Sequence, residues 1–169
     1  MPNQTAPYLK WLNDNGPFES YVEIGSRYGG TFMLTCEALK AKNKSIKALA
    51  CDVIELPIDL KLYLKINNYE YLHGSSMSDI FIKKIKENHW SICLIDGSHK
   101  YEDVLNDYLN VKDNFDVLVF HDIVSDVCPG VVKIWKELKN KNIGKYYEFT
   151  DQYFQDKSYM GIGVIDLRK

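Results

Sequence analysis

The sequence predicts an α/β fold, a Rossmann-like three-layer sandwich on a seven-stranded, mostly parallel sheet with an antiparallel last strand. Two observations lead to this prediction. Short continuous apolar runs alternate with segments whose apolar residues recur at helical spacing, which is typical of parallel strands covered by helices on both faces. The last two strand-like runs follow each other without an intervening helix, so we expect them to pair antiparallel.

The first half of the chain is predicted to alternate helices with three strands. The opening helix is expected to close near Gly16 and Pro17, which are typical turn residues. Pro57 suits the first turn of the third helix, and Ser78 is a good N-cap for the fourth. In order, the predicted elements are helix 5–13, strand 21–24, helix 30–42, strand 46–51, helix 58–67, strand 69–72 and helix 79–87.

The second half is predicted to contain two further strand–helix pairs and the closing strands. Pro129 and Gly130 precede the last helix. The predicted elements are strand 91–95, helix 101–111, strand 116–120, helix 131–139 and strands 146–149 and 161–165. Helical spacing gives helix 101–111 an inward face of Tyr101, Val104, Leu105, Tyr108 and Leu109.

Length and composition narrow the class of protein. A chain of 169 residues suits one domain, residues 1–169, that buries a core without disulfides or metal staples. A net charge of −2 gives no case for binding nucleic acid or an anionic membrane. The four cysteines form no C-x-x-C pair and are expected to act as small hydrophobic residues. Without a leader-like or membrane-spanning apolar run, we expect a reduced, cytoplasmic protein.

Acidic residues and histidines stand where the predicted strands end. Right-handed crossovers, with a reversal of strand order after the third strand, place these ends along one edge of the sheet. The side chains expected to converge on that rim are Glu23, Asp52, His73, Asp96, His121 and Asp122. This convergence is the strongest indication of a site.

A glycine-rich turn in segment 21–31 joins the first strand to a helix. Gly25 and Gly29 permit a sharp turn and a close approach of the backbone to a ligand. Glu23 favours a positively charged or hydroxyl-bearing ligand over a pyrophosphate. The middle glycine of a G-x-G-x-x-G pattern is absent, and Asp52 follows Gly25 by 27 residues, against ~20 in nicotinamide-binding fingerprints. Both observations count against an oxidoreductase.

In their order and spacing, these motifs resemble the class I S-adenosylmethionine-dependent methyltransferases, over roughly residues 21–166. Segment 23–29, Glu-x-Gly-x-x-x-Gly, is similar to the first motif of that family. Asp52 stands where an acid binds the two ribose hydroxyls, and segment 73–76 lies where the family contacts adenine. The resemblance implies S-adenosyl-L-methionine as cofactor, contacted by Glu23, Gly25, Ser26, Gly29, Asp52, Ser75, Ser76 and Asp96.

The resemblance also implies catalytic residues. Segment 96–101, Asp-Gly-Ser-His-x-Tyr, looks like the fourth-strand motif of small O-methyltransferases that act on sugars and other hydroxyls. The implied catalytic residues are Asp96, His99 and His121. A histidine has an ordinary pKa near ~6.5 and can take a proton from an acceptor at neutral pH. Either His99 or His121 is the expected general base.

Metal-dependent members of the resembling family imply a cation site at Asp96, His121 and Asp122. Better-known members carry an acid where His121 stands. Mg²⁺ prefers oxygen donors, whereas Mn²⁺, Fe²⁺ and Zn²⁺ accept imidazole readily. The histidine therefore argues against Mg²⁺, and the need for a metal and its identity stay open.

The expected function is O-methylation of a small hydroxylated acceptor, with sugars among the candidates. One alternative is an NAD(P)-dependent oxidoreductase on the related Rossmann fold, and another is a non-catalytic nucleotide-binding module. Only about twenty residues precede the first strand, so we expect no helical cap of the kind that many members of the family place over the substrate. The acceptor site is then either open or completed by a second copy in a homo-oligomer.

Overall fold

The computed structural model describes residues 2–154 and 157–169, and its centre is one seven-stranded sheet. The strands are β1 (Ser20–Ile24), β2 (Lys47–Asp52), β3 (Glu70–His73), β4 (Trp90–Ile95), β5 (Phe115–His121), β6 (Lys145–Phe149) and β9 (Ile162–Asp166). Their order is β3-β2-β1-β4-β5-β9-β6. Strands β1 to β5 run parallel, and β9 pairs antiparallel with both β5 and β6. The predicted fold class and its strand-order reversal are confirmed.

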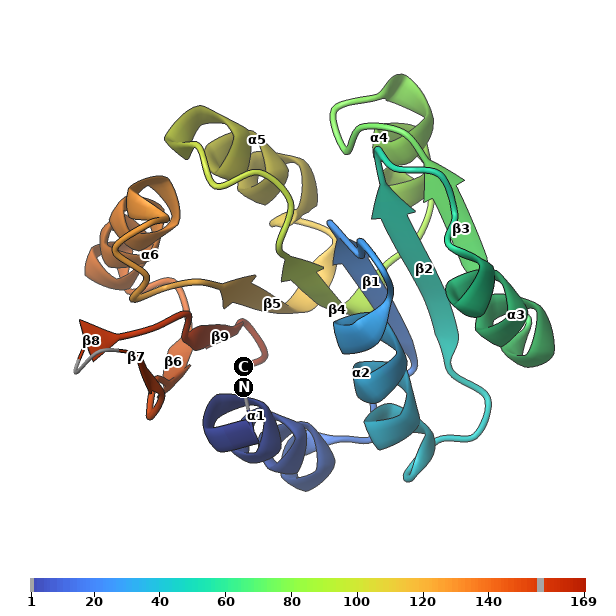
Figure 1. Cartoon of the computed structure of the whole chain (residues 1–169), viewed down its shortest axis with the longest axis horizontal. Coiled ribbons are helices and arrows are strands. Elements are labelled where there is room, and N and C mark those ends of the chain that lie inside the picture. The colour runs from blue at the N-terminus through green and yellow to red at the C-terminus, as the bar shows by residue number, and fades with distance from the viewer. Residues whose placement is uncertain (1, 155–156) are drawn as a thin grey trace.

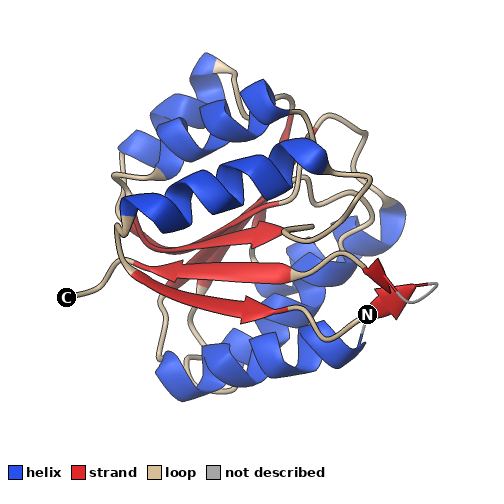
Figure 2. Ribbon diagram, turned by 90° about the vertical axis from the view of Figure 1, so that its left-hand side faces the viewer, coloured by secondary structure: helices blue, strands red, loops and turns tan. Residues whose placement is uncertain are grey.

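Helices cover both faces of this sheet, giving the predicted three layers (Figures 1 and 2). They are α1 (Pro2–Asn15), α2 (Gly30–Lys40), α3 (Ile58–Asn67), α4 (Asp79–Lys86), α5 (Tyr101–Val111) and α6 (Pro129–Lys141). Apolar residues of α1, α2 and α3 form one core with one sheet face. Those of α4, α5 and α6 form a second core with the other face.

Local sequence explains several helix ends. Ser78 caps α4 as predicted, because its side chain accepts a hydrogen bond from the Phe81 N–H at 3.3 Å. Asn68 and Asn142 end α3 and α6 in the left-handed conformation, which asparagine tolerates better than most residues. Pro57 stands immediately before α3, whose bounds match the prediction.

Long-range contacts explain where the predictions fall short. Helix α1 begins three residues earlier than predicted because the buried Gln4 accepts a hydrogen bond from the Gly161 N–H at 2.6 Å. The prediction for the inward face of α5 was wrong at Leu109, which is exposed, while Asp107 is buried instead. The short strands β7 (Tyr153–Phe154) and β8 (Lys157–Ser158), which pair with each other, were not predicted.

No helix among the described residues is long and apolar enough to cross a membrane.

Candidate active site

A cleft of about 1190 Å³ runs along the carboxyl ends of the parallel strands. Ligands bind at this place in open α/β sheets, where the strand order reverses. Of the six rim residues expected from the sequence, five line the cleft: Glu23, Asp52, Asp96, His121 and Asp122. His73 does not, because it is exposed at the end of β3, where its Nε2 lies 3.0 Å from the Val53 carbonyl oxygen.

Gly25 sets the shape of the turn after β1. Its φ is +86°, and a Cβ placed on it would lie 2.1 Å from the backbone oxygen of Asp96. Only glycine can therefore stand where the turn meets the end of β4. Gly29 has a φ of +82° and its own N–H donates to the Ser26 carbonyl at 2.7 Å. Gly29 shapes the loop without lining the cleft.

Asp52 ends β2 and holds the glycine loop. Its Oδ2 accepts a hydrogen bond from the Arg27 N–H at 2.6 Å, and its Oδ1 accepts one from the Ile54 N–H at 3.1 Å. A carboxylate oxygen has two lone pairs, so both oxygens keep capacity for a ligand's hydroxyl groups. Ser26 is buried beside them, and its hydroxyl has no hydrogen-bond partner among the described residues.

Glu23 is the most deeply buried acid of the cleft, at 1% exposure. The Tyr21 hydroxyl donates a hydrogen bond to its Oε2. Burial raises the pKa of Glu23 to about 8, although Tyr21 opposes the shift. A carboxyl held in this way would gain from a positively charged ligand, because such a ligand stabilises its ionised form.

Four titratable side chains meet across the ends of β4 and β5. The Asp96 Oδ1 lies 3.4 Å from Nδ1 of His121 and 3.9 Å from Nε2 of His99. The Asp122 Oδ2 lies 3.5 Å from the same His121 atom and 3.3 Å from the same His99 atom. Two carboxylates and two imidazoles therefore face one another.

Opposite charges shift the pKa values in this cluster. Burial alone would raise the pKa of Asp96, but His121 and His99 hold it below its ordinary value. Burial alone would lower the pKa of His121, but Asp122 and Asp96 raise it to about 10. Asp96 and Asp122 also raise the pKa of His99. The His99 side chain is 45% exposed and that of His121 only 10%, so His99 is the imidazole more accessible from the cleft.

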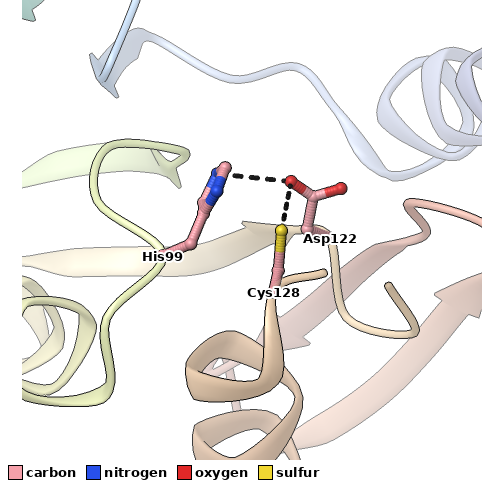
Figure 3. Close-up of side chains that lie close together, drawn as sticks. All are labelled: His99, Asp122 and Cys128. Carbon is pink, nitrogen blue, oxygen red and sulfur yellow. Dashed lines mark hydrogen bonds and ion pairs between the residues drawn. The ribbon is translucent and has the colours of Figure 1, made fainter. Parts of the chain in front are cut away.

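Cys128 lies against the same cluster, although sequence analysis treated the cysteines as packing residues. It precedes α6, and its thiol donates a hydrogen bond to Asp122 Oδ2 at 3.4 Å. Figure 3 shows His99 and Cys128 both directed at this one oxygen. Asp122 itself has a φ of +63°, a left-handed conformation that aspartate tolerates better than most residues. Cys128 stands before α6, whereas Cys36 lies in α2, Cys51 in β2 and Cys93 in β4, and this is the only local signal that it differs from the others.

Ser75 and Ser76 line the cleft in the loop after β3. The Ser76 hydroxyl donates to Oδ1 of Asp107 at 2.6 Å, and the Ser75 hydroxyl accepts from the Met77 N–H at 3.1 Å. Burial raises the pKa of Asp107 to about 6. Asp107 was not predicted from the sequence. Helical spacing that places Leu109 on the inward face of α5 leaves Asp107 outside that face, whereas in the structure Leu109 is exposed and Asp107 is buried.

The predicted cation ligands are close enough to act together. One donor atom from each of Asp96, His121 and Asp122 lies within 4.8 Å of the others. Within the part of the chain that the structure describes, the buried His121 Nδ1 makes no well-formed hydrogen bond despite its two carboxylate neighbours. Two carboxylates and one imidazole fit Mn²⁺ or Fe²⁺ better than Mg²⁺.

No family model and no curated protein matches this sequence, but solved structures share its fold. The cofactor-bound structure of Rv0187 from MTB has a TM-score of 0.74 at 9% identity, covering 98% of this chain and 81% of that chain. An rRNA methylase from Streptococcus thermophilus has a TM-score of 0.69 at 12% identity, covering 98% and 97%.

CalS11, a TDP-rhamnose 3′-O-methyltransferase of calicheamicin biosynthesis, has a TM-score of 0.65 at 12% identity, covering 98% of this chain and 77% of that chain. These likenesses confirm the predicted resemblance at the level of the fold, which is that of S-adenosylmethionine-dependent methyltransferases. The proteins compared are named for acceptors as different as ribosomal RNA and a sugar nucleotide. The fold alone therefore does not select an acceptor.

Proposed function

We propose that this protein is an S-adenosylmethionine-dependent methyltransferase that transfers a methyl group to a hydroxyl of a small acceptor. One observation carries the proposal. The turn at Gly25 brings Glu23 and Asp52 into the same cleft as Asp96 and His99. A volume of about 1190 Å³ exceeds the ~300–1,000 Å³ usual for small-molecule sites, which leaves room for a cofactor and an acceptor.

The side of the cleft near β1 and β2 fits the polar groups of this cofactor. Glu23 would balance the positive charge of its methionine end. Asp52 would accept hydrogen bonds from the two ribose hydroxyls, and the unpaired Ser26 hydroxyl would gain a partner. When bound, S-adenosylmethionine supplies a methyl group on a sulfonium, which is a good leaving group. The protein's own contribution there is alignment, worth several kcal/mol.

His99 is the residue we propose as general base. Nε2 of His99 lies 3.3 Å from Oδ2 of Asp122, and a tautomer with its proton on this nitrogen keeps the lone pair on Nδ1, where it can accept a proton. The exposed edge of His99 makes this atom reachable from the cleft, whereas His121 is enclosed between Asp96 and Asp122. General-base action of this kind contributes ~10²–10⁴ in rate.

Asp96, His121 and Asp122 are the residues we propose as holders of a divalent cation that accepts imidazole. Such a cation would lower the pKa of an acceptor hydroxyl and orient it. In that case EDTA slows the transfer and Mn²⁺ restores it, with His99 remaining the proton acceptor.

A small acceptor is favoured over nucleic acid by the charge of the cleft. Six of its lining residues are acidic: Glu23, Asp52, Asp96, Asp103, Asp107 and Asp122. Carboxylates repel the phosphates on which nucleic-acid binding depends. A neutral, hydroxyl-rich molecule such as a sugar meets no such repulsion.

Thermal unfolding with S-adenosylhomocysteine or NADH tests the cofactor. A ligand present at 100 times its Kd stabilises the folded state by ~2.7 kcal/mol. We expect this stabilisation with S-adenosylhomocysteine and not with NADH. The opposite result would make the protein an oxidoreductase and overturn the proposal. Transfer of labelled methyl groups to a panel of sugars and catechols then separates an enzyme from a non-catalytic binding module.

Asp52→Ala tests the ribose-binding residue. We expect its Kd for S-adenosylhomocysteine, measured by calorimetry, to rise at least ~10-fold, or ~1.4 kcal/mol. The matched control is Glu55→Ala, which removes an exposed acid three residues away that does not line the cleft. Equal affinities in the two variants would rule out the proposed role of Asp52.

A further inference from the structure

A second set of metal-binding side chains lies beside the first and includes a thiol. His99 comes from the loop after β4, Asp122 follows β5, and Cys128 precedes α6 (Figure 3). Oδ2 of Asp122 lies 3.3 Å from Nε2 of His99 and 3.4 Å from Sγ of Cys128. One donor atom from each of the three residues lies within 4.8 Å of the others.

These spacings match a tetrahedral zinc site. With zinc–donor distances of ~2.0–2.1 Å for nitrogen and oxygen and ~2.3 Å for sulfur, neighbouring donors lie ~3.3–3.5 Å apart. The two distances to Asp122 Oδ2 already have these values.

We propose that His99, Asp122 and Cys128 bind Zn²⁺ through three protein donors, leaving one coordination position open towards the cleft. Sulfur and imidazole donors select zinc-like ions, whereas Mg²⁺ and Ca²⁺ prefer all-oxygen sites. A set of three protein ligands with an open position is typical of accessible rather than purely structural zinc sites.

The backbone holds the thiol in place for this role. After Asp122 the chain makes two successive turns, in which Ser125 N–H donates to the Asp122 carbonyl at 3.2 Å and Cys128 N–H to the Ser125 carbonyl at 3.0 Å. These turns return Cys128 to the carboxylate six residues earlier. Both Asp122 and Cys128 are buried, at 7% and 3% exposure, so the two donors are fixed before an ion arrives.

Zinc binding would exchange a proton for the metal without any change of oxidation state. The Cys128 thiol donates a hydrogen bond to Asp122, so it carries its proton in the metal-free protein. On binding, the S–H bond breaks, a sulfur–zinc bond forms, and the proton leaves to solvent.

The zinc site and the proposed reaction would exclude each other, a consequence that rests on the proposed function. Coordination through Nε2 of His99 places the remaining imidazole proton on Nδ1, which then cannot accept another. Both cation sets also use Asp122. Zn²⁺ should therefore inhibit methyl transfer, whereas Mn²⁺ supports it.

Titration of the whole protein with Co²⁺ tests the site without any assay of activity. A cobalt–thiolate bond produces an intense near-ultraviolet charge-transfer band that nitrogen and oxygen ligands do not produce. We expect this band to saturate at one equivalent and to disappear when Zn²⁺ is added. Absence of the band in the wild-type protein would overturn the proposal.

Matched variants identify the ligands. Cys128→Ser should abolish the band, and His99→Ala should raise the Kd for Zn²⁺ at least tenfold. Cys36→Ala removes a buried thiol outside the cleft, and His89→Ala removes an exposed histidine paired with Asp116. Both controls should keep the band, so its persistence in Cys128→Ser, or its loss in Cys36→Ala, would contradict the assignment.

Methyl-transfer assays then test the consequence separately. We expect Zn²⁺ to inhibit the wild-type enzyme at concentrations that saturate the cobalt-detected site, and Cys128→Ser to need at least tenfold more. If no methyl transfer is found but the cobalt band appears, the proposed function fails while the zinc site stands.

Discussion

The two sides of the cleft are built by different means. Near β1 and β2 the backbone determines the shape, through the left-handed turn at Gly25 and the N–H groups that hold Asp52. Near the ends of β4 and β5 side chains determine it, because Asp96 and Asp122 face two histidines at 3.3–3.9 Å. On the first side the backbone fixes the shape of the ligand-binding surface, and on the second side carboxylates and imidazoles of opposite charge face one another.

This difference indicates which substitutions each side of the cleft tolerates least. A backbone-built surface tolerates polar substitutions but not an added side-chain atom where the chain closes on itself. A cluster of buried charges tolerates added volume better than the loss of one member, because the remaining charges are then uncompensated. The predictions below compare substitutions of backbone-determining glycines with substitutions of polar side chains in the cleft, beginning with the largest expected effect.

Gly25→Ala should be the most damaging substitution on the cofactor side. The new Cβ would lie 2.1 Å from the Asp96 carbonyl oxygen, at a φ of +86°. Since the colliding atom is backbone, we expect a loss of ~4–5 kcal/mol or more in the free energy of unfolding, measured by urea denaturation. S-adenosylhomocysteine binding should be lost as well.

Gly30→Ala is the matched control, five residues further along. A Cβ there meets nothing within 4 Å, and Gly30 begins α2. We expect unchanged or slightly increased stability, by up to ~1 kcal/mol, because alanine favours a helix. Equal free energies of unfolding in Gly25→Ala and Gly30→Ala would show that the backbone turn does not determine the shape of this side of the cleft.

The same contrast explains how much of the molecule the sequence predicts. Apolar periodicity located each strand of the main sheet and each helix, because those patterns are local. The glycine turn and the strand-end acids were likewise predicted, since strand polarity alone brings them to one edge. Cys128 and Asp107 were not, because their roles arise from side-chain hydrogen bonds, with Asp122 six residues before Cys128 and with Ser76 in the loop after β3. The contact of Gln4 with Gly161, which lengthens α1, joins residues from the two ends of the chain and leaves no local pattern in the sequence.

Glu23→Gln should make stability less dependent on pH. The pKa of Glu23 is raised from 4.5 to about 8 by burial. Its favourable contribution is therefore complete below pH 4.5 and is lost as the pH rises through about 8. Each pH unit of difference in pKa corresponds to ~1.4 kcal/mol, so we expect the variant to be more stable than wild type by ~2–4 kcal/mol at pH 9. Urea denaturation across pH 5–9 measures this.

The affinity for the cofactor should also depend on pH through Glu23. If the ammonium group of the ligand stabilises the ionised form of Glu23, binding releases a proton, and affinity for S-adenosylhomocysteine rises with pH up to about 8. Calorimetry in buffers of different ionisation enthalpy measures the number of protons released on binding. We expect one proton to be released by the wild-type protein and none by Glu23→Gln. Equal proton release in both proteins would place the titrating group elsewhere.

Ser76→Ala is expected to have the smallest effect, and it asks whether this serine serves the fold or the ligand. Its hydroxyl already donates to Asp107 at 2.6 Å, so removing it leaves a buried carboxyl without that donor. We expect a loss of ~1–2 kcal/mol in stability. The loss should be larger above pH 6, because the pKa of Asp107 is about 6 and its charged form depends most on the bond. The Kd for S-adenosylhomocysteine should change less than threefold; a tenfold rise with little loss of stability would instead make Ser76 a cofactor contact, as the resemblance implied.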